Sequence, residues 1–213
     1  MKRSVASNAY LLEFSLFVSL VLIGAMVRVV FHYAYDLPNF APVAAISLFA
    51  GYYFRSAGLA MLVAPAIMLA SDSLIGFYRW ELMATVYGML MLPVAARPLL
   101  KRVFRLDAPR AVAAGGSFLG LVGCSLAASI AFFLVTNLVV WCEGRYYSPD
   151  LAGLLRCYSQ AIPFFRNTLL GDLFFSCSLF GAYTVVLRTG WNLHKPNLGT
   201  EWLHKAENLI SEL

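Results

Sequence analysis

The chain has 213 residues, of which 61% are hydrophobic and only 13% are charged, and its formal net charge is +5. Average globular domains carry roughly 25% charged residues, so a soluble chain of this length would lack polar surface. The basic residues fall mostly between long apolar runs, which is a pattern of membrane topology and does not indicate nucleic-acid binding. These properties predict an all-α integral membrane protein.

Apolar segments in chain order predict a bundle of six transmembrane helices, because a spanning helix needs about 20 mostly apolar residues. The segments are residues 9–31, 42–54, 57–77, 82–99, 111–142 and 165–187. The second is short, so it could be tilted, incomplete or re-entrant. A kink is expected near Pro93 in the fourth. The fifth has no charged residue, and at roughly 48 Å of helix it must tilt, bend or project beyond the membrane.

An amphipathic surface helix is expected between the last two spans, over residues 149–161. Ser148, Pro149 and Asp150 suit the N-cap, the first helical position and an acidic first turn. Apolar side chains then recur at helical spacing: Leu151, Leu154, Leu155, Tyr158 and Ile162. Such a helix lies on the membrane with its apolar face inward. Pro163 is expected to end it.

The basic residues predict the orientation. Cytoplasmic loops carry an excess of Lys and Arg, and residues 97–110 form the most basic of the segments between spans. This predicts a multi-pass protein of the cell (inner) membrane with both termini cytoplasmic. We therefore expect one transmembrane domain, residues 1–188, and a cytoplasmic tail, residues 189–213, with a short amphipathic helix possible over residues 200–213.

Polar side chains at membrane depth are costly, so each one needs a reason. In the predicted topology, eight polar or aromatic residues fall in the outer half of the membrane or at its outer surface: Asn39, Asp72, Trp80, Tyr87, Asn137, Trp141, Asn167 and Asp172. Together they could line an outward-facing solute pocket, apolar with a few fixed polar groups. Arg28 and Arg166 are close enough along the chain to be charge partners of the aspartates. Alternatively, the same residues only tie the helices together.

The sequence offers no set of residues for catalysis, for a metal or for a cofactor. The four cysteines have no CxxC spacing and no nearby pair of histidines. Neither a Ser/His/Asp constellation nor a phosphate-binding loop joined to a strand is present. Cys142 and Cys157 both fall in the predicted outer loop, where they could form a disulfide or remain two thiols. We therefore expect a protein that is not an enzyme and has no ATPase of its own.

Several blocks of sequence resemble a bacterial membrane-protein family of unknown function. They are Arg28, residues 38–45 running into 48–51, Ser71-Asp72 with Gly76-Phe77, Phe133 with Asn137 and Trp141, and Cys157-Tyr158 with residues 161–172. The resemblance covers most of the chain, from about residue 28 to 181. The last block is the most specific.

That family is similar to the substrate-capture (S) subunits of energy-coupling-factor (ECF) transporters. The resemblance implies capture of a vitamin-like micronutrient on the outer face, with a separate transmembrane coupling protein and cytoplasmic ATPases as partners beside the membrane lipids. The AxxxA motif expected on the first span is absent, and Ser15 and Ser19 give the nearest spacing. The alternative function is a membrane scaffold or assembly protein with no role in transport.

Overall fold

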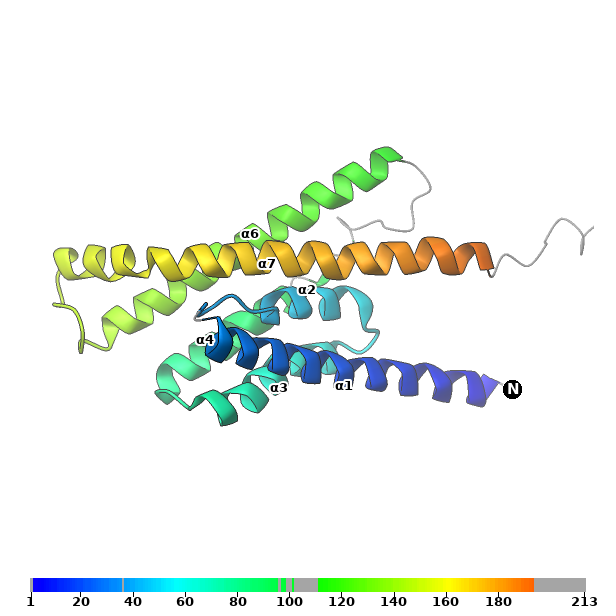
Figure 1. The fold of residues 1–213 in the computed structure, drawn as a ribbon, viewed down its shortest axis with the longest axis horizontal. Coiled ribbons are helices and arrows are strands. Elements are labelled where there is room, and N and C mark those ends of the chain that lie inside the picture. The colour runs from blue at the N-terminus through cyan, green and yellow to red at the C-terminus, as the bar shows by residue number, and fades with distance from the viewer. Residues whose placement is uncertain (1, 36, 96, 99–100, 102–110, 194–213) are drawn as a thin grey trace, which may run out of the picture. The chain divides into compact units, whose positions relative to one another are not determined.

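The computed structural model describes residues 2–35, 37–95, 97–98, 101 and 111–193. In these ranges the chain is helical with no strand (Figure 1). The main helices are α1 (Lys2–Ala34), α2 (Val43–Tyr53), α3 (Ala57–Ile75), α4 (Trp80–Ala95), α6 (Ala111–Cys142) and α7 (Leu151–Leu193). The basic loop within residues 97–110 and the predicted tail helix over residues 200–213 lie largely or wholly outside the described residues.

The chain divides into two compact units, Met1–Leu179 and Phe180–Leu213. Helices α1 to α6 and the first part of α7 belong to the first unit. Within the second unit, the structure describes the last part of α7, up to Leu193. The cavity described below lies in the first unit.

Four helices are long and apolar enough to cross a membrane: Tyr10–Ala34 of α1, Ala57–Ile75 of α3, Phe118–Cys142 of α6 and Leu151–Val186 of α7. Helices α2 and α4 are apolar but shorter. The four long helices fit a multi-pass membrane protein, as the composition predicts. At 11 residues, α2 is only about 16 Å long, about half of a bilayer's hydrocarbon thickness.

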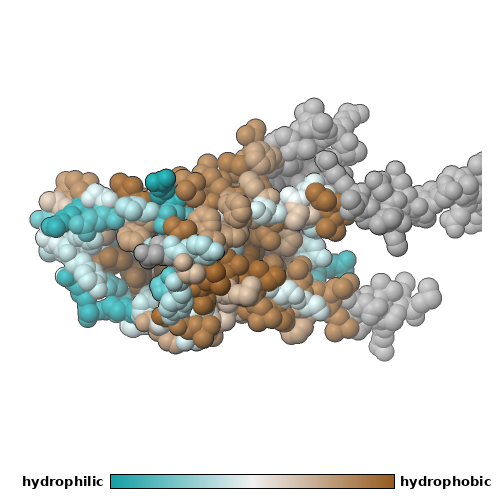
Figure 2. All heavy atoms as spheres, viewed as in Figure 1, coloured by the Kyte–Doolittle hydropathy of each residue, from teal (hydrophilic) through white to brown (hydrophobic). Residues whose placement is uncertain are grey.

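Much of the outer surface is apolar, and several polar side chains are buried beside the hydrophobic core. Large apolar residues face outward, such as Leu22 and Leu119, which are 65% and 72% exposed. The buried polar side chains, by contrast, lie within helices: Glu13, Ser47, Ser71, Asp72, Ser125, Ser129, Thr136, Asp172 and Ser176. Figure 2 shows hydrophobic residues over the middle of the helices and hydrophilic residues at the end with the α3–α4 and α6–α7 loops. Burying polar groups and exposing apolar ones is favourable only when lipid surrounds the helices.

Short connections set the order of the helices. Helix α1 packs against α3, and the short α2 packs against α3, α4 and α6. Residues 45–51 of α2 are all buried. The connections 35–42, 76–79 and 143–150 all lie at one end of the helices, which we call the loop end. At the opposite end, Arg97 Nη2 donates to the carbonyl oxygens of Phe54 and Arg55, which ties the chain beyond α4 to the α2–α3 connection.

The predicted separate surface helix is continuous with the last span. Helix α7 runs without interruption from Leu151 to Leu193, with Pro163 inside it. The prediction that Pro163 ends a helix is therefore wrong. Proline is tolerated within spanning helices because neighbouring groups and small backbone adjustments satisfy the carbonyl that it leaves unpaired.

The start of α7 also differs from the prediction. Asp150, rather than Ser148, caps the helix, because its Oδ1 accepts from the backbone N–H of Gly153 at 2.6 Å. Ser148 Oγ donates to the same oxygen at 2.8 Å. These two hydrogen bonds hold the pKa of Asp150 below its usual value, with the Gly153 bond contributing most. The acidic group thus stays charged where the partial positive charge of a helix N-terminus favours it.

Candidate solute-binding cavity

A cavity of about 450 Å³ lies between the helices near the loop end. Residues of α1, α2, α3, α4, α6 and α7 line it, together with the connection 37–41. Pockets for small molecules have volumes of roughly 300–1,000 Å³, so this cavity has the size of a ligand site.

Aromatic side chains form much of the cavity wall. The set comprises Phe40, Tyr78, Phe132, Phe133, Phe164 and Phe165. The rings of Phe133 and Phe165 lie 4.5 Å apart between centroids, and this pair joins α6 to α7. Phe40 packs against Phe31 at 5.0 Å and Phe175 at 5.5 Å. These contacts fix the rings and leave an apolar surface that suits a flat or hydrophobic ligand.

The α1–α2 connection enters the cavity wall as a tight turn. The N–H of Phe40 donates to the carbonyl of Leu37, and Asn39 has φ +66°. Pro38 followed by a residue with positive φ is the signature of a type II turn, and Asn tolerates this conformation well. Irregular backbone at membrane depth is tolerated where it lines a cavity, as residues 37–41 do.

Two residues of α7 hold this turn in place. Asn167 Nδ2 donates to the carbonyl oxygen of Pro38 at 3.1 Å. Gly171 lies so close that a Cβ there would be 3.2 Å from the backbone nitrogen of Ala41 and 3.3 Å from Cα of Phe40. The absence of a side chain at Gly171 therefore lets α7 approach the backbone of the turn.

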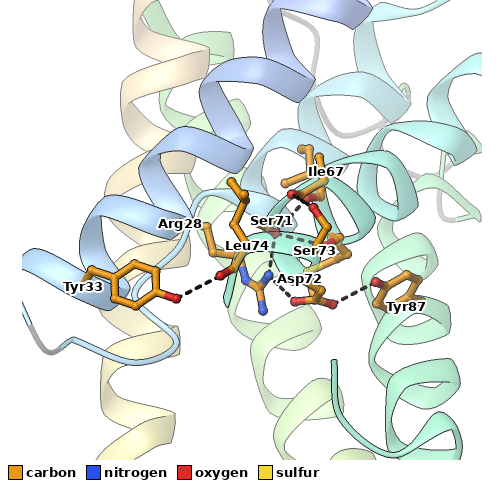
Figure 3. Close-up of polar contacts among 10 residues, drawn as sticks. Arg28, Tyr33, Ile67, Ser71, Asp72, Ser73, Leu74 and Tyr87 are labelled. Atoms are coloured by element: carbon orange, nitrogen blue, oxygen red, sulfur yellow. Dashed lines mark hydrogen bonds and ion pairs between the residues drawn. The ribbon is translucent and has the colours of Figure 1, made fainter. Parts of the chain in front are cut away.

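Arg28 reaches inward from α1 to a buried polar cluster (Figure 3). Its Nη1 lies 2.5 Å from Asp72 Oδ1 and 2.5 Å from Ser71 Oγ. Tyr87 of α4 donates to the other oxygen of Asp72 at 2.8 Å. Arg28 lines the cavity, whereas Asp72 is 0% exposed and lies behind it. Asp72 thus positions Arg28 and matches its charge, and Tyr87 holds Asp72.

Asp172 is the carboxylate that lines the cavity, and it is 4% exposed. Ser129 Oγ of α6 lies 2.6 Å from its Oδ2. Among the described residues, no Lys, Arg or His forms an ion pair with Asp172. The two aspartates therefore do not share a cation: Asp72 has Arg28, and Asp172 has a hydroxyl.

Asn137 also lines the cavity. Its Nδ2 donates to the carbonyl of Phe133 one turn earlier, at 2.7 Å. This bond uses one of the two amide hydrogens, so the side chain has its oxygen as an acceptor and one hydrogen as a donor to offer to a ligand. The Cys157 thiol donates to the backbone oxygen of Asn137 at 3.4 Å, so α7 also packs against α6 at this level.

The eight predicted site residues thus fall into three groups. Asn39, Asn137 and Asp172 line the cavity, as does the predicted charge partner Arg28. Asp72, Tyr87 and Asn167 do not line it: Asp72 and Asn167 hold the lining residues Arg28 and Pro38, and Tyr87 bonds to Asp72. Trp80 and Trp141 are not brought to the cavity. Trp80 is 70% exposed, and Trp141 donates from Nε1 to the carbonyl of Ser148 in the α6–α7 connection. Arg166 is exposed and pairs with neither aspartate.

The suggested Cys142–Cys157 disulfide is not formed. Both cysteines are free: Cys142 is exposed at the end of α6, and Cys157 is buried against that helix. The two thiols lie in different surroundings because α7 turns Cys157 inward.

Sequence reasoning missed several cavity residues, including His32, Tyr78, Thr136 and Thr168. Burial, with the charge of Asp72, raises the pKa of Tyr78 to about 12, so its hydroxyl remains a donor at neutral pH. One signal could have revealed part of this set. Ser125, Ser129, Phe132 and Thr136 recur at helical spacing along one face of α6, and the three hydroxyl residues are buried.

Residues 9–194 match a family described as a family of unknown function (DUF6580). The chain belongs to this family. No curated protein and no solved structure matches the sequence. The match covers every residue that lines the cavity, so the cavity lies wholly within the family's region.

The groups that line the cavity can bind a small molecule. Among the described residues, no group of three or more His, Cys, Asp and Glu side chains could hold a metal ion. The cavity presents one carboxylate, one matched guanidinium, amide and hydroxyl groups, and an aromatic wall. Such a set can orient a small molecule by hydrogen bonds and charge while burying its apolar surface.

Proposed function

We propose that this protein captures a small solute in the cavity at the loop end and serves as the solute-binding subunit of a transporter. The observation that carries the proposal is the cavity itself: about 450 Å³, aromatic walls and a few oriented polar groups. If the polar residues only tied helices together, the protein would not need a cavity of this size with aromatic walls and oriented polar groups.

In this proposal α2 and α4 complete six spans, and the loop end faces outward. The basic segment 97–110 follows α4 in the sequence, and its described residue Arg97 contacts the α2–α3 connection at the opposite end. Its basic residues favour the cytoplasmic side. Both termini are then cytoplasmic. The resemblance to S subunits of ECF transporters supports a vitamin-like micronutrient as the solute. It also supports a coupling protein with ATPases as partners.

A membrane scaffold is the second candidate function. It is favoured by the contacts in which predicted site residues act as ties, such as Asn167 to Pro38 and Trp141 to Ser148. These contacts position helices and loops without facing the cavity. A scaffold, however, gives no account of the unmatched carboxylate of Asp172 in the cavity wall.

Native mass spectrometry of the purified protein tests solute capture directly. We expect a small molecule to co-purify with the wild type. Ala128 lines the cavity, so Ala128→Phe should fill part of it and abolish the bound mass. Ala127 is its exposed neighbour on α6, so Ala127→Phe adds the same side chain outside the cavity and should retain the ligand.

Thermal unfolding of both variants separates lost binding from lost folding, because overpacking alone can destabilise by roughly 1–3 kcal/mol. The ligand's mass should disappear from folded Ala128→Phe protein only. A ligand retained by Ala128→Phe, or a wild type free of any small molecule when prepared from native membranes, would contradict solute capture and favour the scaffold.

A further inference from the structure

Asp172 is a buried carboxylate with no cationic partner among the described residues. It is 4% exposed, and among the described residues its side-chain partner is the hydroxyl of Ser129. An isolated charge within a membrane is costly. Charged side chains at this depth therefore pair with other groups or face a site where a ligand does so.

The other charged group in the cavity wall is not a partner for the carboxylate of Asp172. Arg28 also lines the cavity, but its guanidinium is already matched by Asp72. His32 lines the cavity from an exposed position at the end of α1. The cavity wall therefore holds one carboxyl group that no cation of the described residues matches, and that group is Asp172.

Two further features favour a positively charged organic group. The faces of aromatic rings attract cations, and the wall contains six such rings. Asn137 lines the cavity and its amide oxygen can accept a hydrogen bond from a donor on the ligand. Carboxylate, amide oxygen and ring faces all suit an ammonium or a protonated ring nitrogen.

We propose that the captured solute is a small organic cation, with its positively charged nitrogen at Asp172 and an apolar or aromatic body against the phenylalanines. This inference rests on the proposed function and adds the chemical class of the solute. An inorganic cation is less well served, because the described residues include no cluster that could hold a metal ion. The cavity is also many times larger than such an ion.

Three probes of matched size and different charge test the sign of the solute: 2-phenylethylamine, 2-phenylethanol and 3-phenylpropionate. Each is added to purified protein freed of endogenous ligand, and binding is measured by thermal shift and isothermal titration calorimetry. We expect the amine to bind at least about tenfold more tightly than the alcohol, and the acid to bind least. Equal binding of the amine and the alcohol would overturn the inference.

Asp172→Asn tests whether the preference for the amine over the alcohol depends on Asp172. It should reduce amine binding at least about tenfold and leave alcohol binding nearly unchanged. Glu81→Gln is the matched control, because Glu81 pairs with Arg79 and does not line the cavity. This variant should keep the preference of the wild type. If Asp172→Asn does not fold, the comparison of probes on the wild type still decides.

Two more results would contradict the chemical class of the solute without contradicting solute capture. A co-purified ligand that lacks a basic nitrogen would overturn the organic cation while leaving solute capture intact. Stabilisation by NaCl over KCl without any effect of the amine would also overturn it, in favour of an inorganic cation. No binding of the amine combined with no co-purified molecule would contradict both proposals.

Discussion

The ion pair between Arg28 and Asp72 joins α1 to α3 in a region where neither charge can be hydrated freely. Asp72 is fully buried, whereas the Arg28 side chain is 20% exposed. Ser71 and Tyr87 satisfy further hydrogen bonds of the two groups. Breaking a buried pair by removing one partner leaves an uncompensated charge, which costs much more than replacing both partners.

Asp72→Asn should therefore destabilise the protein by about 3–5 kcal/mol, because Arg28 keeps its charge without a partner. The double variant Arg28→Met with Asp72→Leu should recover much of this loss, since both charges are removed together. Thermal unfolding in detergent measures both. A double variant less stable than Asp72→Asn would show that the pair contributes more than mutual compensation.

The cost of burying charge made Arg28, Asp72 and Asp172 predictable from sequence. All three are polar groups within apolar segments, and the structure gives each an inward position. Trp80 and Trp141 carry no such cost, so nothing in the sequence distinguished a ring in a cavity from a ring at an interface. The division between Asn137, which lines the cavity, and Asn167, which holds a turn, depends on tertiary contacts that spacing does not specify.

Helix boundaries were predictable where a single segment is long and apolar, as in α6, which begins and ends at the predicted residues. They were not predictable at Pro163, because the effect of a proline on a helix depends on whether water or lipid surrounds it. Pro163 ends a helix in water, but in lipid the neighbouring helices can satisfy the freed carbonyl, and α7 continues. The short α2 was visible from sequence, whereas the use of its preceding connection as a cavity wall was not.

The approach of α7 to the 37–41 turn depends on one glycine. Gly171→Ala should push α7 away from Phe40 and Ala41, because the new Cβ would contact backbone that has little freedom to move. We expect lower thermal stability and weaker solute binding. Gly123→Ala in α6 is the matched control, since among the described residues no atom outside its own stretch of helix lies within 4 Å of its Cβ position.

Gly123→Ala should be neutral or stabilising by up to roughly 0.5–1 kcal/mol, because alanine favours a helix over glycine. The contrast between the two variants isolates close packing from helix propensity. Equal effects of the two substitutions on unfolding and binding would contradict a role for Gly171 in placing the turn.

The apolar outer surface and the position of the connections together indicate how the unit Met1–Leu179 would sit in a membrane. Apolar side chains cover its outer surface, and the connections 35–42, 76–79 and 143–150 share one end. The chain must then alternate between the two sides at each helix that crosses. The orientation as a whole follows from deciding the side of any one connection.

Cys142 offers a natural reporter of that side, because it is exposed at the loop end. In a variant that keeps Cys142 as its only cysteine, a membrane-impermeant maleimide added to intact cells should label it. Gly58→Cys, made in a chain without other cysteines, places a thiol at the exposed start of α3 at the opposite end and should react only after the cells are opened. This outcome follows from the basic residues beyond α4, which favour the cytoplasm. Labelling of position 58 but not Cys142 in intact cells would invert the topology, and the cavity would then open to the cytoplasm, where it could not capture a solute from outside.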